Sequence, residues 1–186
     1  MNVLVIYGTT EGQTQKVARF VAEQLEELGH QAQVVNAIDD GAAAVDPGRF
    51  DAIIVAASLH AGHYQSAIIH FVSRNLAQIN ARPNAFLSVS LAAAGQDEDD
   101  ARGLEQCLAT FTQQTGWTPQ HVHHVAGAFR YTSYDFLKRW AMKYIAYRKG
   151  APTDTSRDHE FTDWADLARF AASFPTGSQS ARSMTR

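Results

Sequence analysis

The chain has 186 residues, a length that fits one folded domain and does not require a second core. Its 45% hydrophobic and 19% charged residues are typical of a globular protein and exclude a disordered one. A net charge of −3 argues against nucleic acid as a partner, and the single cysteine excludes an internal disulfide. One unpaired cysteine suits a reducing compartment, so we expect a cytoplasmic protein. No apolar run is long enough to cross a bilayer, so any membrane contact must be peripheral.

The first apolar run, residues 2–7, leads through a glycine- and threonine-containing turn into a helical pattern. Such a turn lets threonine hydroxyls and backbone N–H groups at a helix N-terminus point at one phosphate group. No Lys or Arg lies within residues 1–15, whereas triphosphate sites usually carry the lysine of the P-loop pattern. The turn therefore favours flavin mononucleotide (FMN) over ATP or GTP, although such turns also occur without a ligand. The candidate phosphate residues are Thr9, Thr10, Glu11, Gly12, Gln13 and Thr14.

Further apolar runs alternate with helical patterns along the chain, which is typical of a parallel sheet covered on both faces. The pattern predicts strands at 2–7, 31–36, 51–57, 84–90 and 121–128. It predicts a first helix that ends at Gly29, a second before Asn75, and a third over residues 99–115 behind the acidic run 97–100. The last helix should begin at Thr162, as the N-cap, and end at Phe174 before Pro175.

Two further loops follow predicted strands at the edge of the sheet where ligands of doubly wound folds bind. The loop after the third strand contains Ser58, Leu59, His60, Ala61, Gly62, His63 and Tyr64. Its glycine allows close backbone approach, His60 and Tyr64 offer flat faces for stacking on a redox ring, and His60 and His63 can act as proton donors. The loop after the fourth strand contributes Ser90, Leu91 and Ala92. The alternative is that these are ordinary residues of exposed loops.

The histidines of the fifth predicted strand raise the question of a metal site. Side chains alternate along a strand, so His121 and His123 face one way and His124 the other. No carboxylate or cysteine accompanies them at ligand spacing, and we therefore expect no metal.

The segment 130–161 is longer than a minimal five-stranded domain requires and reads as an insertion within a domain of residues 1–174. Residues 134–149 have the pattern of a basic, aromatic amphipathic helix. Such a helix can lie on an anionic membrane surface or hold an anionic aromatic ligand, but it can equally pack on the sheet with its charges in water. Residues 175–186 are rich in Ser, Gly, Thr and Arg and are expected to form a flexible tail.

Five segments of the chain together resemble one known family. They are Tyr-Gly-Thr-Thr-Glu-Gly-Gln-Thr (7–14), Ala-Ala-Ser-Leu-His-Ala-Gly-His-Tyr (56–64), Ala-Gly-Ala-Phe-Arg-Tyr (126–131), Thr-Asp-Thr (153–155) and Thr-Asp-Trp (162–164). In this order they resemble the flavodoxin-like, menaquinone-dependent protoporphyrinogen IX dehydrogenases. The first segment is common to flavodoxins, whereas the later ones and the insertion are more specific to this family.

The resemblance implies an α/β fold of the flavodoxin type, with a five-stranded parallel sheet in the order 2-1-3-4-5. It implies FMN as cofactor and oxidation of protoporphyrinogen IX to protoporphyrin IX, with electrons passed to a membrane quinone in haem biosynthesis. The insertion would then meet the flat substrate and its propionates, and residues 134–149 could touch the inner face of the cell membrane. The substrate candidates are Arg130, Tyr131, Lys138, Arg139 and Lys143, and no catalytic residue is assigned.

One departure from the family concerns residues 96–100, a glutamine followed by four acidic residues, close behind the loop after the fourth strand, where family members carry basic residues. Negative charge there would repel propionates and anionic lipid, so this loop is not assigned to either. Two other functions fit the same cofactor: an electron-carrier flavodoxin, and an FMN-dependent NAD(P)H:quinone reductase.

Overall fold

The computed structural model describes residues 1–94, 98–129 and 159–182 of the chain. Its centre is a five-stranded parallel sheet with the strand order β2-β1-β3-β4-β5. This order confirms the flavodoxin-like arrangement that the sequence predicts. The strands are β1 (Asn2–Gly8), β2 (Gln31–Asn36), β3 (Ala52–Ser58), β4 (Asn84–Ser90) and β5 (His121–Ala126).

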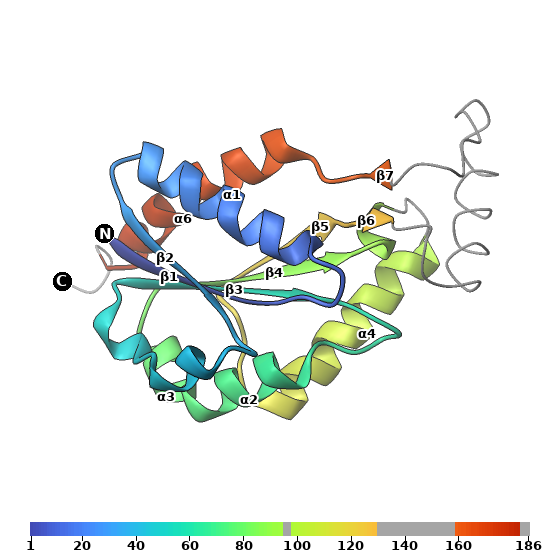
Figure 1. Cartoon of the computed structure of the whole chain (residues 1–186), viewed down its shortest axis with the longest axis horizontal. Helices are drawn as coiled ribbons and strands as arrows, with labels where there is room; N and C mark the ends of the chain where they lie inside the picture. The colour runs from blue at the N-terminus through green and yellow to red at the C-terminus, as the bar shows by residue number, and fades with distance from the viewer. Residues whose placement is uncertain (95–97, 130–158, 183–186) are drawn as a thin grey trace.

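Helices cover both faces of the sheet, so the described part has three layers (Figure 1). One face carries α1 (Gln13–Glu27) and α6 (Trp164–Arg182), and the other carries α2 (Ser66–Arg74), α3 (Leu76–Asn80) and α4 (Glu98–Thr115). Short 3₁₀ turns, η1 (Asp40–Ala44), η2 (Pro47–Arg49) and η3 (Ala92–Ala94), lie in the connections. A small antiparallel pair, β6 (Ala128–Phe129) and β7 (His159–Glu160), stands apart from the main sheet.

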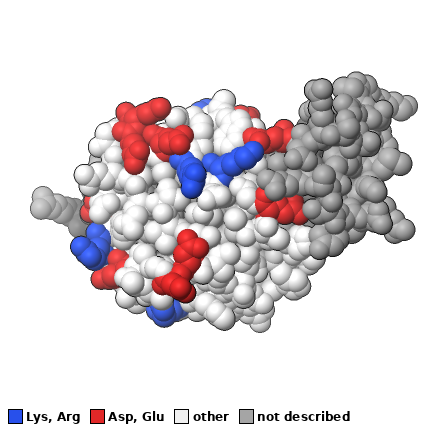
Figure 2. All heavy atoms as spheres, viewed as in Figure 1, with Lys and Arg blue, Asp and Glu red and all other residues white. Residues whose placement is uncertain are grey.

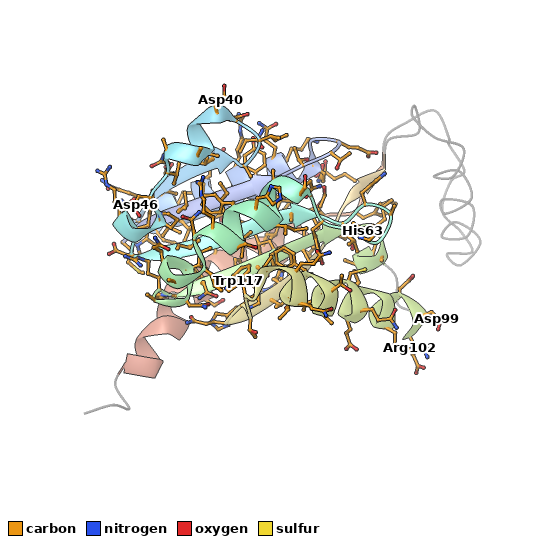
Figure 3. All side chains as sticks on the ribbon, turned by 90° about the horizontal axis from the view of Figure 1, so that it is seen from below. Asp40, Asp46, His63, Asp99, Arg102 and Trp117 are labelled. Carbon is orange, nitrogen blue, oxygen red and sulfur yellow. The ribbon has the colours of Figure 1, made fainter. Side chains whose placement is uncertain are left out.

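The core is double because the sheet is buried on both sides. Along β1, Val3 and Val5 pack against α1 and α6, while Leu4 and Ile6 pack on the opposite side. This alternation is the period-2 direction of strand side chains. The second side also holds a group of aromatic residues, namely Tyr64, Phe86, Phe111 and Trp117, of which the last is fully buried. Figure 3 views the molecule from the side that Figure 1 shows covered by α2, α3 and α4, and Trp117 is labelled on this side.

The first helix ends as its sequence predicts. Gly29 has a left-handed φ of 82°, and its N–H donates to the carbonyl of Glu26 at 2.9 Å. The N–H of His30 donates to the carbonyl of Leu25 at 3.0 Å. This pair of bonds is a Schellman motif, which favours glycine at the residue with positive φ.

Other boundaries differ from the prediction. The fifth strand ends at Ala126 rather than at residue 128, and after Gly127 the chain enters the antiparallel β6. The last helix begins at Trp164, and its N-cap is Asp163, whose carboxylate accepts from the N–H of Asp166 at 2.9 Å. The predicted N-cap, Thr162, is wrong because its hydroxyl is used elsewhere: it donates to the carbonyl of Ala126 at 2.7 Å. The same helix continues to Arg182, past the expected end at Phe174 and through Pro175, so the expectation of a flexible tail from residue 175 does not hold for residues 175–182.

The surface gives two further facts about possible partners. On the face shown in Figure 2, acidic and basic side chains of the described residues are interspersed and form no continuous basic stripe. Within the described residues, no helix has both the length and the apolar composition needed to span a membrane.

Candidate cofactor site

A pocket lies at the carboxyl ends of the strands, where the sequence analysis places its three loops. Residues that follow β1, β3, β4 and β5 line it. The strand order reverses beside β1, and this is the position at which doubly wound sheets hold nucleotides. The lining residues are Thr9, Thr10, Glu11, Gln13, Thr14, Ser58, Leu59, His60, Val89, Ser90, Leu91 and Gly127.

The loop after β1 is folded to present hydrogen-bond donors. The hydroxyl of Thr9 accepts a hydrogen bond from the N–H of Gly12 at 2.9 Å, which closes the turn. Gly12 has a left-handed φ of 91°, and this turns the chain into α1. The first backbone hydrogen bond of α1 runs from the N–H of Lys16 to the carbonyl of Gly12. The N–H groups of residues 13–15 therefore have no acceptor within the helix. They form an anion site of the helix N-terminal kind.

Thr14 is the residue that best shows which kind of ligand the pocket suits. Its side chain is fully buried, and among the described residues its hydroxyl has no hydrogen-bond partner. A buried hydroxyl without a partner costs about 1–3 kcal/mol. Because Thr14 also lines the pocket, an anionic oxygen bound there would satisfy this hydroxyl. The residues present therefore fit the phosphate of FMN.

The charge of the pocket also bears on the ligand. Glu11 is the only Asp, Glu, Lys or Arg among the lining residues. The nearby Lys16 is paired with Glu160, with 3.1 Å between its Nζ and a carboxylate oxygen. The phosphate cradle thus consists of neutral hydroxyl and N–H donors, as the sequence predicts, and suits a monoester better than a triphosphate.

The loop after β3 contributes only its first part to the pocket. Ser58, Leu59 and His60 line the pocket. His60 then pairs with His63 through two backbone bonds of 2.9 and 3.0 Å. Ala61 and Gly62, with φ of 49° and 83°, form the two-residue turn between them. Both centres have positive φ, as in a type I′ turn. Ala61, Gly62 and His63 are exposed and do not line the pocket, and Figure 3 shows His63 in this loop.

The structure corrects the role predicted for Tyr64. Its ring is buried and packs edge to face against both rings of the stacked pair Phe86 and Phe111, with centroid separations of 5.1 Å to each. Its hydroxyl forms a 2.8 Å hydrogen bond with the hydroxyl of Ser88. Burial raises the pKa of Tyr64 to about 12. This residue is therefore part of the core, and the prediction that it offers a face for stacking on a redox ring is wrong.

The fourth and fifth strands complete the pocket. Ser90 and Leu91, both predicted cofactor residues, line the pocket. Ala92, the third residue predicted in this loop, is the first residue of η3 and does not line it. Val89 and Gly127 also line it and were missed by the sequence reasoning. Both stand at or next to the carboxyl end of a strand, so a consistent use of that rule would have found them. The loops are tied together, because the N–H of Leu59 donates to Val89 and that of Gly127 to Ser90.

The ends of the insertion are fixed beside this pocket. The side-chain amide of Gln13 donates to the hydroxyl of Thr162 at 2.9 Å, and that hydroxyl donates in turn to the carbonyl of Ala126. The N–H of Phe161 donates to the carbonyl of Gly127 at 3.1 Å. The first turn of α1 and the residues around the pair β6–β7 thus form one connected unit. The predicted substrate residues Arg130, Tyr131, Lys138, Arg139 and Lys143 lie outside the described residues.

The histidines of β5 have partners on α6. The ring of His123 stacks on Phe170, with centroids 5.2 Å apart, and its Nε2 lies 2.9 Å from a carboxylate oxygen of Asp166. The ring of His121 contacts Phe174 edge to face. These two histidines share one side of the strand, as the alternation predicts. The described residues contain no group of three potential metal ligands.

The architecture and the pocket define a flavodoxin-type domain that binds FMN. A family model described as a flavodoxin domain matches residues 4–156. The fold resembles that of oxidised flavodoxin 1 from Bacillus cereus, with a TM-score of 0.56 and 15% identity over 95% of this chain and 98% of that one. It also resembles the Flv1 flavodiiron core from Synechocystis sp. PCC6803, with a TM-score of 0.56 and 16% identity over 97% of this chain and 36% of that one.

Curated relatives define the family more narrowly. The chain is 34% identical to protoporphyrinogen IX dehydrogenase [quinone] of Escherichia coli K12, over 92% of this chain and 93% of the relative. It is also 34% identical to the protein of the same name from Leishmania major, over 92% of this chain and 73% of that protein. The chain therefore belongs to the family of flavodoxin-like, quinone-dependent protoporphyrinogen IX dehydrogenases.

Proposed function

We propose that this protein oxidises protoporphyrinogen IX to protoporphyrin IX and passes the electrons to a membrane quinone. The observation that carries the proposal is the 34% identity, over nearly the full length of both chains, to a protein named for this activity. The cofactor pocket supports it, since the donors around Thr14 fit the phosphate of FMN. The reaction would place the protein in haem biosynthesis, as an oxidoreductase.

Bound FMN supplies a carrier that accepts two electrons at a time, and the oxidation removes six electrons in three such steps. The described residues hold this carrier in place. The neutral cradle after β1 binds the phosphate, and the loops at Ser58–His60 and Ser90–Leu91 lie where the backbone can bond the polar edge of the ring. Among the described lining residues, His60 carries an imidazole, the side-chain type most often used for proton transfer in enzymes.

Substrate and membrane contacts are part of the same proposal. Basic and aromatic residues at 130, 131, 138, 139 and 143 suit a flat macrocycle that carries propionates. The basic amphipathic pattern of 134–149 suits contact with an anionic membrane, where both the substrate and the quinone partition. We place the protein in the cytoplasm, peripheral to the inner face of the cell membrane. The hydrogen bonds that join Gln13, Thr162 and Ala126 support the proposed substrate contact, because they hold one end of the insertion beside the cofactor pocket.

The test is an anaerobic assay with purified protein, FMN, protoporphyrinogen IX and a soluble quinone analogue, followed by porphyrin fluorescence. Fluorescence should rise only when protein, FMN and quinone are all present. A parallel reaction with NAD(P)H in place of the porphyrinogen separates the NAD(P)H:quinone reductase alternative. A flat porphyrin trace from protein with FMN demonstrably bound would refute the proposed oxidation and favour one of the two alternatives.

A variant lacking residues 134–149 tests the role of the insertion. This deletion should leave FMN binding intact, because every residue that lines the described pocket lies outside it. It should abolish porphyrinogen oxidation. Retained oxidation after the deletion would show that the basic segment has no part in substrate binding.

A further inference from the structure

The side chain of Gln65 lies next to the cofactor pocket and connects two of the loops that line it. Its amide nitrogen donates to the hydroxyl of Thr10, in the phosphate loop, at 3.1 Å. The same nitrogen donates to the hydroxyl of Ser58, at the end of β3. The two hydroxyls lie 3.5 Å apart, and both residues line the pocket, whereas Gln65 is not among its lining residues.

The position of Gln65 in the chain shows that its side chain serves this contact and not the helix. It is the N-cap residue of α2, where Ser, Thr, Asp and Asn are preferred because their short side chains bond the helix N–H groups. The side chain of Gln65 makes no such bond. It extends toward the pocket instead, and only its backbone carbonyl serves the helix, accepting from Ile68 and Ile69.

A neighbouring glycine leaves the room for this arrangement. A Cβ atom at Gly8, the last residue of β1, would lie 3.1 Å from the amide oxygen of Gln65 and 2.7 Å from Cγ1 of Ile68. The first distance is tight, and the second requires a neighbouring atom to move. The absence of a side chain at Gly8 therefore leaves the space that the amide group of Gln65 occupies.

The orientation of the amide follows from which unpaired atom costs less. With its nitrogen toward the hydroxyls, the amide leaves one buried oxygen without a partner. Reversing the amide would leave both N–H donors unpaired instead. Buried unpaired N–H groups are rarer in proteins than under-satisfied carbonyl oxygens. The orientation with the nitrogen toward Thr10 and Ser58 is thus the favourable one.

This orientation decides what the pocket offers to a ligand. Because each hydroxyl accepts from Gln65, each keeps its own proton free to donate into the pocket. Gln65 occupies acceptor sites on both hydroxyls and so favours the orientation in which both protons point to the ligand. Without Gln65 this orientation loses its support, and a bond between the two hydroxyls, which lie 3.5 Å apart, would withdraw one donor from the pocket. An anionic phosphate requires donors, and none of the described residues that line the pocket is a Lys or Arg that could replace one.

We infer that Gln65 is a positioning residue that makes the hydroxyls of Thr10 and Ser58 hydrogen-bond donors for the phosphate of the cofactor. The inference rests on the proposed function, because it concerns the FMN site. It predicts that Gln65 contributes to the binding of FMN but much less to the binding of riboflavin, which has the same ring and no phosphate.

The test is a pair of titrations, with FMN and with riboflavin, on apoprotein of each variant. Gln65→Leu should raise the Kd for FMN roughly tenfold and leave that for riboflavin within about twofold. Gln65→Glu should raise the Kd for FMN further, about a hundredfold, because a carboxylate accepts from both hydroxyls and repels the phosphate. Gln106→Leu, the same change on the exposed part of α4, is the matched control and should change neither Kd.

A structural role for Gln65 gives a different pattern. If the residue only holds the two loops together, Gln65→Leu will weaken FMN and riboflavin by the same factor, and the inference fails. A second measurement uses a background of Thr10→Val with Ser58→Ala. There Gln65→Leu should have no further effect on FMN, since the hydroxyls through which it acts are gone, and a further tenfold loss would refute the inference. Circular dichroism and melting of each apoprotein check that the variants are folded.

The experiment distinguishes this inference from the proposed function. It requires no porphyrinogen, so a protein that binds FMN but does not oxidise porphyrinogen still decides the role of Gln65. A wild-type protein that binds no FMN refutes both. Normal FMN binding by Gln65→Leu refutes the inference alone.

Discussion

Replacing Thr14 by valine should have opposite effects on the apoprotein and on the FMN complex: the apoprotein should become more stable, and the affinity for FMN should fall. Valine keeps the shape of threonine and removes only the hydroxyl. In the described structure this hydroxyl is fully buried and has no partner. Relief of an unpaired buried hydroxyl should stabilise the apoprotein by about 1 kcal/mol. For a chain of this size, that corresponds to a rise in Tm of roughly 2–4 °C.

The FMN complex should lose affinity in the same variant. A hydrogen bond to a charged group contributes about 1.5–3 kcal/mol, so the Kd for FMN should rise roughly ten- to hundredfold. Chemical denaturation of apoprotein measures the first effect, and titration by flavin fluorescence measures the second. Thr115 is the matched control, because it is also buried but its hydroxyl donates to Phe111 at 2.8 Å and accepts from Trp117.

The control should behave in the reverse way. Thr115→Val should destabilise the protein by about 1–2 kcal/mol, since it leaves the buried N–H of Trp117 without its acceptor, and should not change the Kd for FMN. Loss of stability in Thr14→Val apoprotein would show that its hydroxyl is paired in solution. An unchanged Kd for FMN would show that this hydroxyl does not contact the phosphate. Either result refutes the assignment of the cradle.

Three other changes test separate parts of the structure. Glu11→Gln should tighten FMN binding by about threefold at low salt, because it removes a negative charge from the pocket that holds the phosphate. The gain should be smaller at high salt, since salt screens the repulsion. A variant that binds FMN no more tightly than the wild type at either ionic strength would place Glu11 away from the phosphate. Gly8→Ala should destabilise the protein by about 1–3 kcal/mol, since its Cβ would lie 2.7 Å from Ile68, and unchanged urea denaturation would contradict this packing. The pKa of Tyr64 is raised from 10.0 to about 12, so the wild type should lose stability as pH rises from 10 to 12, by roughly 2–3 kcal/mol more than Tyr64→Phe. Parallel loss in both proteins over that range would show that the ring is not held neutral by burial.

The parts of the fold that follow from local pattern were predictable. The end of α1 is an example, because Gly29 is the one residue type that readily takes the positive φ of a Schellman motif. The strands β1, β3 and β4 are buried on both faces and were recognised from their apolar runs; these three and the less buried β2 were placed within one residue of their observed ends. That the loop after β1 lines the pocket was predictable for the same reason, since its donors come from one continuous segment, and its role in binding the phosphate stays a prediction.

The parts that depend on distant contacts were not. Tyr64 follows a glycine-containing loop and looks exposed in the sequence, but its position is decided by Phe86 and Phe111 on other elements. Thr162 and Asp163 are both good N-cap residues, and the choice falls on Asp163 because the hydroxyl of Thr162 bonds Ala126. The pair β6–β7 joins residues about thirty positions apart with two residues on each side, which is too short to leave a pattern.

The position of that pair also bears on how one fold supports different chemistry. The fold is shared with a flavodoxin at 15% identity, and a fold does not by itself select a substrate. The chain leaves this common framework at Phe129 and returns at His159, two residues paired in the same hairpin. Gly127, two residues before the departure, lines the pocket, and Thr162, three residues after the return, bonds Gln13 of the phosphate cradle. The described residues on both sides of this segment thus lie beside the pocket or bond a residue that lines it, and we expect a change at Gln13 or Thr162 to alter substrate oxidation as well as FMN binding.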